Sequence, residues 1–334
     1  MNWSSGFSAS YYMTTVDPVT WLDLDRIEIT GGSIDRVDNG LRQSADIDCK
    51  DYQPEVEQWI RVYLDAKQGD TSDHVPLFTG LGTSPSRNIK GTWEENGLQC
   101  FSVLKPADDV ILERGWFAPA GENGADLIKQ LLRPTPAPVE VDGTAPALTE
   151  TIIAENGETN LTMVEKILGA MAWQLRITGR GDIVLAPYDS DYVAMFDPIE
   201  NDVIETDIKV SMDLYSCPNV FMAVSDDMTS VARDEDENSP LSIQNRGREV
   251  WMYEGSCYLA DDESISEYAM RRLKEEQQYS IAASYNRRYN PEIFPGDIIR
   301  ISYPEQELDG YFVVESQNIE LSHGARTSEQ VINV

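Results

Sequence analysis

The sequence predicts a mainly β protein with an α+β insert, in which two antiparallel β-barrel or β-sandwich domains flank a small α+β domain. Short segments of alternating apolar and polar residues, separated by turn residues, fill residues 1–108 and return over 197–334. This pattern is typical of antiparallel sheets. Between them, residues 109–196 contain two segments with helical periodicity. We therefore expect domains at 1–108, 109–196 and 197–334, with one helix near 264–279 in the third.

The first β-domain is expected to contain about seven strands. Gly31-Gly32 and Asp38-Asn39-Gly40 are interpreted as turns, because Gly and Asn tolerate positive φ. Residues 65–73 are interpreted as a polar acidic loop. The expected strands are Ser8–Met13, Trp21–Leu24, Arg26–Thr30, Ser44–Cys49, Trp59–Leu64, Leu77–Gly80 and Gly97–Leu104.

The middle domain is expected to pair two helices with a hairpin. A short amphipathic helix over 124–132 is stopped by the Pro-rich segment 133–138, which is a stiff connector. A second helix over 160–172 carries its apolar residues on one face. The strands Trp173–Ile177 and Ile183–Leu185 follow. The tripeptide Arg180-Gly181-Asp182 between them is interpreted as a hairpin turn.

The third domain returns to strands around one helix. Ser264 and Glu267 have capping-box spacing and predict the start of that helix. Residues 226–240 are interpreted as a long acidic loop. Turns are expected at Pro295-Gly296-Asp297 and at Asp309-Gly310. The expected strands are Ile204–Met212, Asn219–Val224, Val250–Tyr253, Ile298–Tyr303, Tyr311–Val314, a strand through Ile319 and Leu321, and a last one through Val331, Ile332 and Val334.

The charge balance excludes several classes of function. Hydrophobic residues make up 41% and charged residues 25% of the chain, which is the range of globular proteins. Lys and Arg number 26 against 58 Asp and Glu, and 26 − 58 gives a net charge of −32. Such a polyanion repels DNA and anionic lipid, so DNA binding through a basic patch is excluded. Passage of DNA along an acidic wall is compatible with this charge.

No membrane span or export signal is predicted. The chain has no apolar stretch of about 18 residues. Residues 1–15 lack both a basic n-region and an apolar h-region.

Motifs for catalysis, cofactors and metals are missing from the sequence. The two histidines, His74 and His323, have no Ser or Cys motif beside them, and no phosphate loop occurs. A calcium loop starting at Asp234 would have Ser239 in place of Gly and Asn245 in place of Glu. We therefore expect no catalytic residue, no cofactor and no metal.

The four cysteines are expected to be reduced thiols, although their even number leaves disulfides open. They are Cys49, Cys100, Cys217 and Cys257.

Several motifs together resemble phage baseplate hub proteins, a family that includes the late control D tail proteins and the hub half of type VI secretion spikes. In the second β-domain these are Asn219–Val224, Asn238–Ile243, Arg246–Arg248, the helix 264–279, Phe294–Ile299 and Gly310–Val314. The helix 160–172 with Trp173–Leu175 and Gly181–Leu185 is similar to the small domain that such hubs carry between their β-domains.

The resemblance implies a structural virion protein. Such hubs form homotrimers in which two tube-type β-domains per chain build a pseudo-hexameric ring. The ring joins the tail tube to a spike or tip protein, and its bore conducts DNA and the tape-measure protein. Baseplate or distal tail proteins would surround it. The protein would be made in the host cytoplasm and reside in the virion tail; host and tail type stay open. With no spike or lysozyme extension after Val334, a separate chain is expected to supply the tip.

Exposed acidic loops are the predicted lining of the bore, because carboxylates keep a polyanion from adhering. The candidate bore residues are Asp65, Asp70, Asp73, Asp226, Asp227, Asp234, Glu235, Asp236, Glu237, Asp261, Asp262 and Glu263.

Two other functions stay open. One is a carboxylate-dependent peptidoglycan hydrolase of the tail tip, which would need an acid of raised pKa in a groove. The other is a carbohydrate-binding tail module that uses exposed tryptophans. The tryptophans are Trp3, Trp21, Trp59, Trp93, Trp116, Trp173 and Trp251, most of them in apolar contexts.

Overall fold

The computed structural model describes residues 1–38, 43–50, 52–90, 93–188, 191–197, 203–212, 215–225, 228–255, 257, 259, 263–278, 281–306, 308–322 and 325–333.

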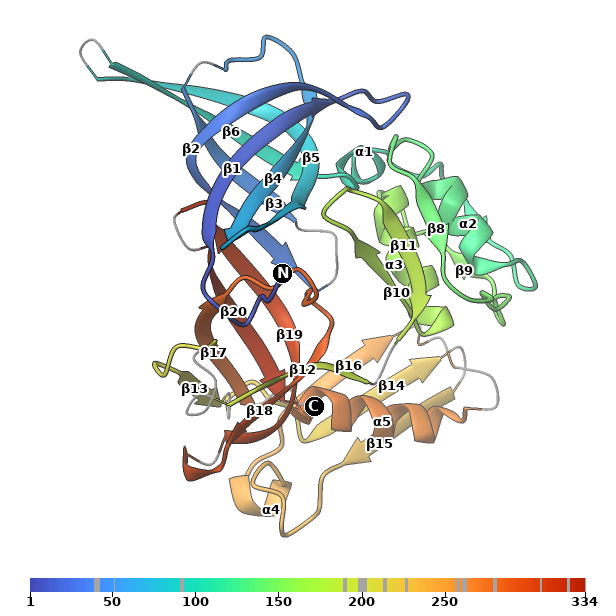
Figure 1. Ribbon diagram of the computed structural model, residues 1–334. Coiled ribbons are helices and arrows are strands. Elements are labelled where there is room, and N and C mark those ends of the chain that lie inside the picture. The colour runs from blue at the N-terminus through green and yellow to red at the C-terminus, as the bar shows by residue number, and fades with distance from the viewer. Residues whose placement is uncertain are drawn as a thin grey trace.

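Six antiparallel strands close into a barrel at the N-terminal end of the chain (Figure 1). The order is β1-β4-β5-β6-β3-β2, and β2 pairs again with β1. Alternate residues of each strand point inward and form an apolar core that includes Met13, Ile47 and Leu64. The strands are β1 Ser8–Val16, β2 Asp23–Val37, β3 Ser44–Cys49, β4 Gln58–Gln68, β5 Thr71–Lys90 and β6 Trp93–Ser102.

Two sequence expectations fail in this barrel. Gly31-Gly32 is not a turn but an irregularity inside β2, where the pairing with β3 shifts register. Gly32 has a φ of +132°, and a Cβ there would lie 2.2 Å from the Asp46 carbonyl oxygen, so only glycine fits. Residues 65–73 are mostly strand, because β4 and β5 continue to a tight turn at Gly69 and Asp70.

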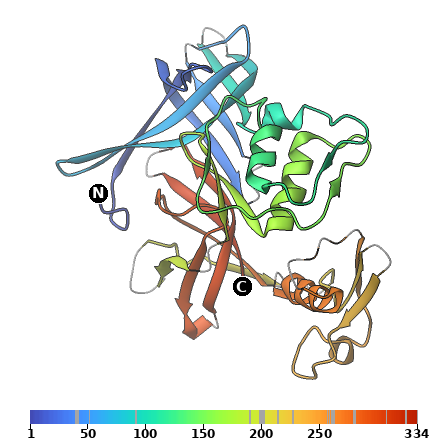
Figure 2. The ribbon, with the colours of Figure 1, turned by 90° about the vertical axis from the view of Figure 1, so that its right-hand side faces the viewer.

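The insert packs two helices against a three-stranded sheet (Figure 2). Helix α2, Gly124–Leu131, and helix α3, Asn160–Met171, confirm both predicted helices. Asn123 and Thr159 cap them by accepting from the backbone N–H three residues on. The sheet has the order β10-β11-β8, and a two-stranded sheet joins β7 to β9. The remaining elements are α1 Lys105–Asp108, β7 Phe117–Ala118, β8 Val139–Val141, β9 Ile152–Ile153, β10 Trp173–Ile177 and β11 Ile183–Pro187.

The β10–β11 hairpin turn fastens the insert to the barrel. Residues 179–182 form the turn predicted from the sequence, and it rests on β4 and β5. The Thr79 hydroxyl donates to the Gly179 carbonyl at 2.9 Å, and Arg61 donates to the Arg180 carbonyl at 2.9 Å. The tripeptide is therefore a docking turn between two units.

A second curved sheet follows, with the order β12-β18-β19-β20-β17-β13. Strand β19 pairs with β18 through its first half and with β2 through its second half, on either side of an irregularity at Glu315. The β2·β19 pairing makes the barrel and the second sheet one continuous twelve-stranded sheet. The strands are β12 Tyr192–Phe196, β13 Lys209–Met212, β17 Ile281–Arg288, β18 Ile298–Tyr303, β19 Leu308–Glu320 and β20 Arg326–Asn333.

Residues 215–278 contain a smaller unit that projects from the second sheet (Figure 1). One face of its sheet, in the order β15-β14-β16, packs on helix α5 around a core that includes Phe221, Ala269 and Leu273. Helix α5 begins one residue after Ser264, as the capping box predicted. The elements are β14 Val220–Ser225, β15 Met228–Arg233, α4 Ile243–Arg246, β16 Trp251–Gly255 and α5 Ile265–Gln278.

The mainly β fold class with a small α+β insert is confirmed. Three further element predictions are wrong, and one strand was missed. Residues 228–233 were expected in an acidic loop but form β15. Asp309-Gly310 was expected to be a turn but lies inside β19, and the chain turns between β18 and β19 at the 3-10 helix Pro304–Gln306. Residues 192–196 belong to the second sheet through β18, not to the insert. Strand β17 was not predicted, because its polar residues hide the alternation.

No helix of the described residues is long and apolar enough to span a membrane. The four cysteines are buried thiols.

Candidate functional site

The continuous sheet presents a polar outer face that crosses from the barrel to the second sheet. Residues that point into the cores alternate with residues that point away from them, and the strand register aligns the latter in rows. One row runs Gln99, Asp46, Ser33 and Glu320 over β6, β3, β2 and β19. The next runs Phe101, Ser44, Asp35, Asn318, Ser328 and Asn286 and ends on β17.

Four carboxylates give this face its charge. Asp46 and Glu320 are exposed, and Asp35 and Asp48 are half-buried. The Asn318 side-chain amide donates to Asp35 at 2.7 Å, which fixes that carboxylate without neutralising it. The two rows contain no Lys or Arg, but Arg288 and Arg326 lie on the same face next to Glu320, and Arg326 binds Glu205 at 2.8 Å. We call Asp35, Asp46, Asp48 and Glu320 the acidic sheet face.

Those acids predicted to line a bore that the structure describes do not belong to the acidic sheet face. Asp70 and Asp73 are exposed at the β4–β5 hairpin. Asp65, on the same hairpin, lies 2.5 Å from His74 and 3.3 Å from Arg26. These three acids are therefore a group separate from the acidic sheet face.

The other predicted acids belong to the small unit. Asp234 organises its own loop by accepting from Ser239 at 2.6 Å and from Gln277 at 2.9 Å. Glu235, Asp236 and Glu237 are exposed on that loop. Asp226, Asp227, Asp261 and Asp262 lie outside the described residues.

Sequence reasoning missed the acidic sheet face because it searched loops. A signal was present in residues 44–49, where polar and apolar residues alternate and the two aspartates share one parity. That alternation predicts a common face for Asp46 and Asp48. Asp35 and Glu320 could not be added, because they join the face through strand pairings that are far apart in the sequence.

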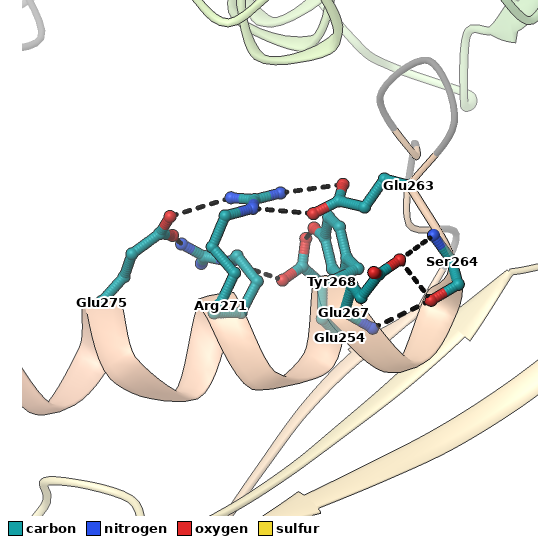
Figure 3. A network of polar contacts seen from close by, with 8 residues as sticks. Glu254, Glu263, Ser264, Glu267, Tyr268, Arg271 and Glu275 are labelled. Atoms are coloured by element: carbon teal, nitrogen blue, oxygen red, sulfur yellow. Dashed lines mark hydrogen bonds and ion pairs between the residues drawn. The ribbon is translucent and has the colours of Figure 1, made fainter.

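A cleft of about 1810 Å³ separates the small unit from the insert and the second sheet. Helix α5 forms one wall with an ion-pair network (Figure 3). Arg271 binds Glu263 and Glu275, each at 2.8 Å. Hydrogen bonding to Glu263 is the largest cause that raises the pKa of Arg271, so the guanidinium stays charged. Glu263, the remaining acid predicted to line a bore, lies just before α5 and is paired with Arg271 within that helix.

Glu254 of β16 completes the network. It accepts from the Tyr268 hydroxyl at 2.7 Å and from Arg272 at 3.2 Å (Figure 3). Burial, and then this hydrogen bond, raise the pKa of Tyr268, so its hydroxyl remains a donor. Arg272 also binds Glu275 and Glu276. The network clamps α5 on its sheet and leaves these carboxylates engaged with arginines.

Asp38 also lines the cleft, with its residue exposed at the surface. The pKa of Asp38 is raised, mainly because the surrounding protein reduces the hydration of its carboxylate. The nearby Arg176 guanidinium lowers the pKa, whereas the negative charges of Glu315 and Asp297 raise it further. Among the described residues, no group of His, Cys, Asp and Glu could hold a metal ion.

Comparison with known proteins shows what this arrangement resembles. No family model and no curated protein matches the sequence. Among solved structures, a tail protein from Neisseria meningitidis superposes with a TM-score of 0.71 at 16% identity, covering 97% of each chain. The 43 kDa tail protein of prophage MuSo2 from Shewanella oneidensis gives 0.71 at 12% identity, covering 97% of this chain and 96% of that one. This chain has the fold of phage tail proteins.

The likeness extends to secretion machinery. A type VI secretion system component from E. coli, itself structurally similar to the T4 bacteriophage tail proteins gp27 and gp5, superposes with a TM-score of 0.54 at 10% identity. It is matched over 92% of this chain and 74% of its own. The resemblance to tail hub proteins drawn from the sequence is confirmed at the level of the fold.

Proposed function

We propose that this chain is a structural hub of a phage tail, a homotrimer whose ring joins the tail tube to a tip or spike and conducts DNA. The observation that carries the proposal is the continuous twelve-stranded sheet with one polar, acidic face. The fold likeness to two tail proteins over nearly the whole chain supports it. The role is structural, and partners are the tube, baseplate or distal tail, spike and tape-measure proteins.

The acidic sheet face is the proposed wall of the bore. Carboxylates at Asp35, Asp46, Asp48 and Glu320 repel the phosphates of DNA over about one Debye length, which is about 8 Å at physiological salt. Uncharged Ser, Asn and Gln side chains, together with Phe101, fill the rest of the two rows. A wall with this composition lets a polyanion slide without phosphate contacts.

The second sheet offers edges for closing a ring. Within the described residues, β12 pairs with β18 alone and β13 pairs with β17 alone. Unpaired strand edges are sites for pairing with another chain. A ring of three copies requires heterologous contacts that close, so β12 or β13 of one copy would meet a different surface of the next.

The test is assembly of the purified chain. Mass photometry over a concentration series, alone and with the cognate tube protein, should show a species of three times the 37.5 kDa chain. Negative-stain images should show a ring with a central hole. A chain that stays monomeric at high concentration with tube protein present would refute the proposal.

One observation favours the hydrolase as a second candidate. Asp38 combines a raised pKa with a place in the cleft, which that function requires. Clearing of a peptidoglycan suspension by the purified chain, lost in Asp38→Asn, would support it. A wild-type chain that forms rings but does not clear peptidoglycan would exclude the hydrolase and support the structural hub.

A further inference from the structure

A row of polar side chains is buried where the barrel joins the second sheet. Arg36 on β2, Gln317 on β19, Glu329 on β20 and Tyr285 on β17 are successive cross-strand neighbours. Their side chains point inward, opposite to the acidic sheet face, and each residue is 3% exposed or less. Arg287 and Tyr289 extend the row, also within 2% exposure. We call these six residues the polar seam.

The seam is organised by one buried ion pair. Arg287 binds Glu329 at 2.5 Å, and both side chains are 0% exposed. The Gln317 amide donates to the same Glu329 oxygen at 2.7 Å and to the Ile293 carbonyl at 2.9 Å. Arg36 donates to the Leu77 carbonyl. These bonds connect β17, β19 and β20 with one another and with the loop at Ile293, and they connect β2 with β5.

Six polar atoms of the seam have no partner within ordinary hydrogen-bond geometry among the described residues, although the Tyr285 hydroxyl lies near enough to the Glu329 carboxylate to interact with it. They are Arg36 Nη1, Tyr285 Oη, Arg287 Nε, Tyr289 Oη, Gln317 Oε1 and Glu329 Oε2. Buried polar groups in native proteins are almost always satisfied by protein or by ordered water. Leaving a charged guanidinium and a carboxylate partly unsatisfied in a protein interior is costly. Something must therefore bond to these atoms.

Water fits the chemistry of the set. The six atoms are two guanidinium donors, two carbonyl or carboxylate acceptors and two hydroxyls, which can donate or accept. Burial, and then the nearby Glu329 carboxylate, raise the pKa of Tyr285, so its hydroxyl stays protonated and can donate. One buried water makes about three hydrogen bonds. A small water cluster thus satisfies donors and acceptors together, which an ion of one sign could not.

We propose that the polar seam binds internal water molecules that bridge Glu329 and Gln317 to the tyrosine hydroxyls and guanidinium nitrogens around them. The site lies at the β2·β19 pairing, so its waters help to hold the barrel and the second sheet in one register. This inference does not depend on the proposed function.

A high-resolution crystal structure of the wild-type chain tests the proposal directly. Water density is expected within hydrogen-bond distance of Glu329 Oε2 and Gln317 Oε1. A seam in which these oxygens bond directly to protein groups, with no water between them, would overturn the inference.

Oxygen-17 relaxation dispersion in solution provides a second test. The wild-type chain should show long-lived internal water, and the double variant Arg287→Met with Glu329→Leu should lose part of that signal. This variant is expected to fold, since apolar replacement of a whole buried ion pair is tolerated. Ser328→Ala, on the opposite face of β20, is the matched control and should keep the wild-type signal. A folded double variant with undiminished internal water would contradict the proposal.

Discussion

Arg61 is fully buried, yet every nitrogen of its guanidinium has an acceptor. Nε donates to Thr79 and Nη1 to Asp23, at 2.9 and 2.8 Å. Nη2 donates to the carbonyls of Arg180 and Trp21. Because these acceptors belong to the barrel wall, its first loop and the insert, one side chain bonds three segments. Its burial could not be predicted from the strand pattern of residues 59–64, which identifies a face but not a charged partner.

Replacement of Arg61 should be among the most destabilising single changes in the chain. Arg61→Met removes the donor to two carbonyls and the cation beside Asp23, which keeps its hydrogen bonds from Tyr63 and Thr14. Because Asp23 is 35% exposed, we expect a loss of about 1.5–3 kcal/mol, as for hydrogen bonds that involve a charged group. Urea unfolding followed by circular dichroism measures the change. Arg26→Met is the matched control, because Arg26 is 60% exposed and its pair with Asp65 contributes about 0–1 kcal/mol. Equal losses in the two variants would refute this assignment.

Asp23 should make stability depend on pH in the acid range. Burial opposes its ionisation, but hydrogen bonds from Tyr63 and Thr14 and the Arg61 guanidinium lower its pKa overall. A lowered folded-state pKa contributes stability that is present above the unfolded pKa and lost as the pH falls through the folded one. The stability of Asp23→Asn should therefore decrease less than that of the wild type as the pH falls below about 5. Melting temperatures measured over a series of pH values test this. Asp25→Asn, at an exposed neighbour, is the control for removing one carboxylate from this end of β2.

Among the elements, the β10–β11 hairpin has a turn that also binds the insert to the barrel. Its sequence, with glycines at 179 and 181, predicts a turn in any context. The barrel adds a second requirement, because a Cβ on Gly179 would lie 1.8 Å from the Pro76 carbonyl oxygen. Gly181 has a φ of +83° and packs on Thr79. The close approach of two backbones, and not turn geometry alone, demands glycine here.

Gly179→Ala should lift this turn from the barrel. Hydrogen–deuterium exchange is expected to rise at residues 76–79 and 178–182, and the melting temperature to fall. Gly169→Ala is the control, since this α3 glycine has open space around it and the change should stabilise by about 0.5–1 kcal/mol. Unchanged exchange at 76–79 in the Gly179 variant would show that the turn does not depend on this contact.

At the scale of the molecule, the position of the carboxylates matters as well as their number. The net charge of −32 is a property of composition, but the acidic sheet face is set by strand register. The loop acids predicted for a bore stay a proposal in the assembled ring. The structure adds a second set, Asp35, Asp46, Asp48 and Glu320, on one face of one continuous sheet.

Neutralising the acidic sheet face should make assembled rings retain DNA. We expect the variant Asp35→Asn, Asp46→Asn, Asp48→Asn and Glu320→Gln to co-sediment with short duplex DNA at low salt, with binding weakening as salt rises. The control removes the same charge from exposed acids of the insert that are not proposed for the bore, as Glu113→Gln, Glu122→Gln, Asp142→Asn and Glu150→Gln. Equal retention by both variants would show that total charge alone acts.

Local sequence patterns and composition predict the fold class, the two insert helices, the capped start of α5 and the polyanionic character. These follow from local periodicity, caps and composition, which need no knowledge of distant residues. Long-range strand pairing, in contrast, sets the β2·β19 joint, the small unit built on β14 to β16, the buried Arg61 and the polar seam. Each depends on register between strands far apart in the chain, and a shift of one residue exchanges the two faces of a strand. That is why carboxylates at residues 35, 46, 48 and 320 share a face that their sequence positions do not reveal.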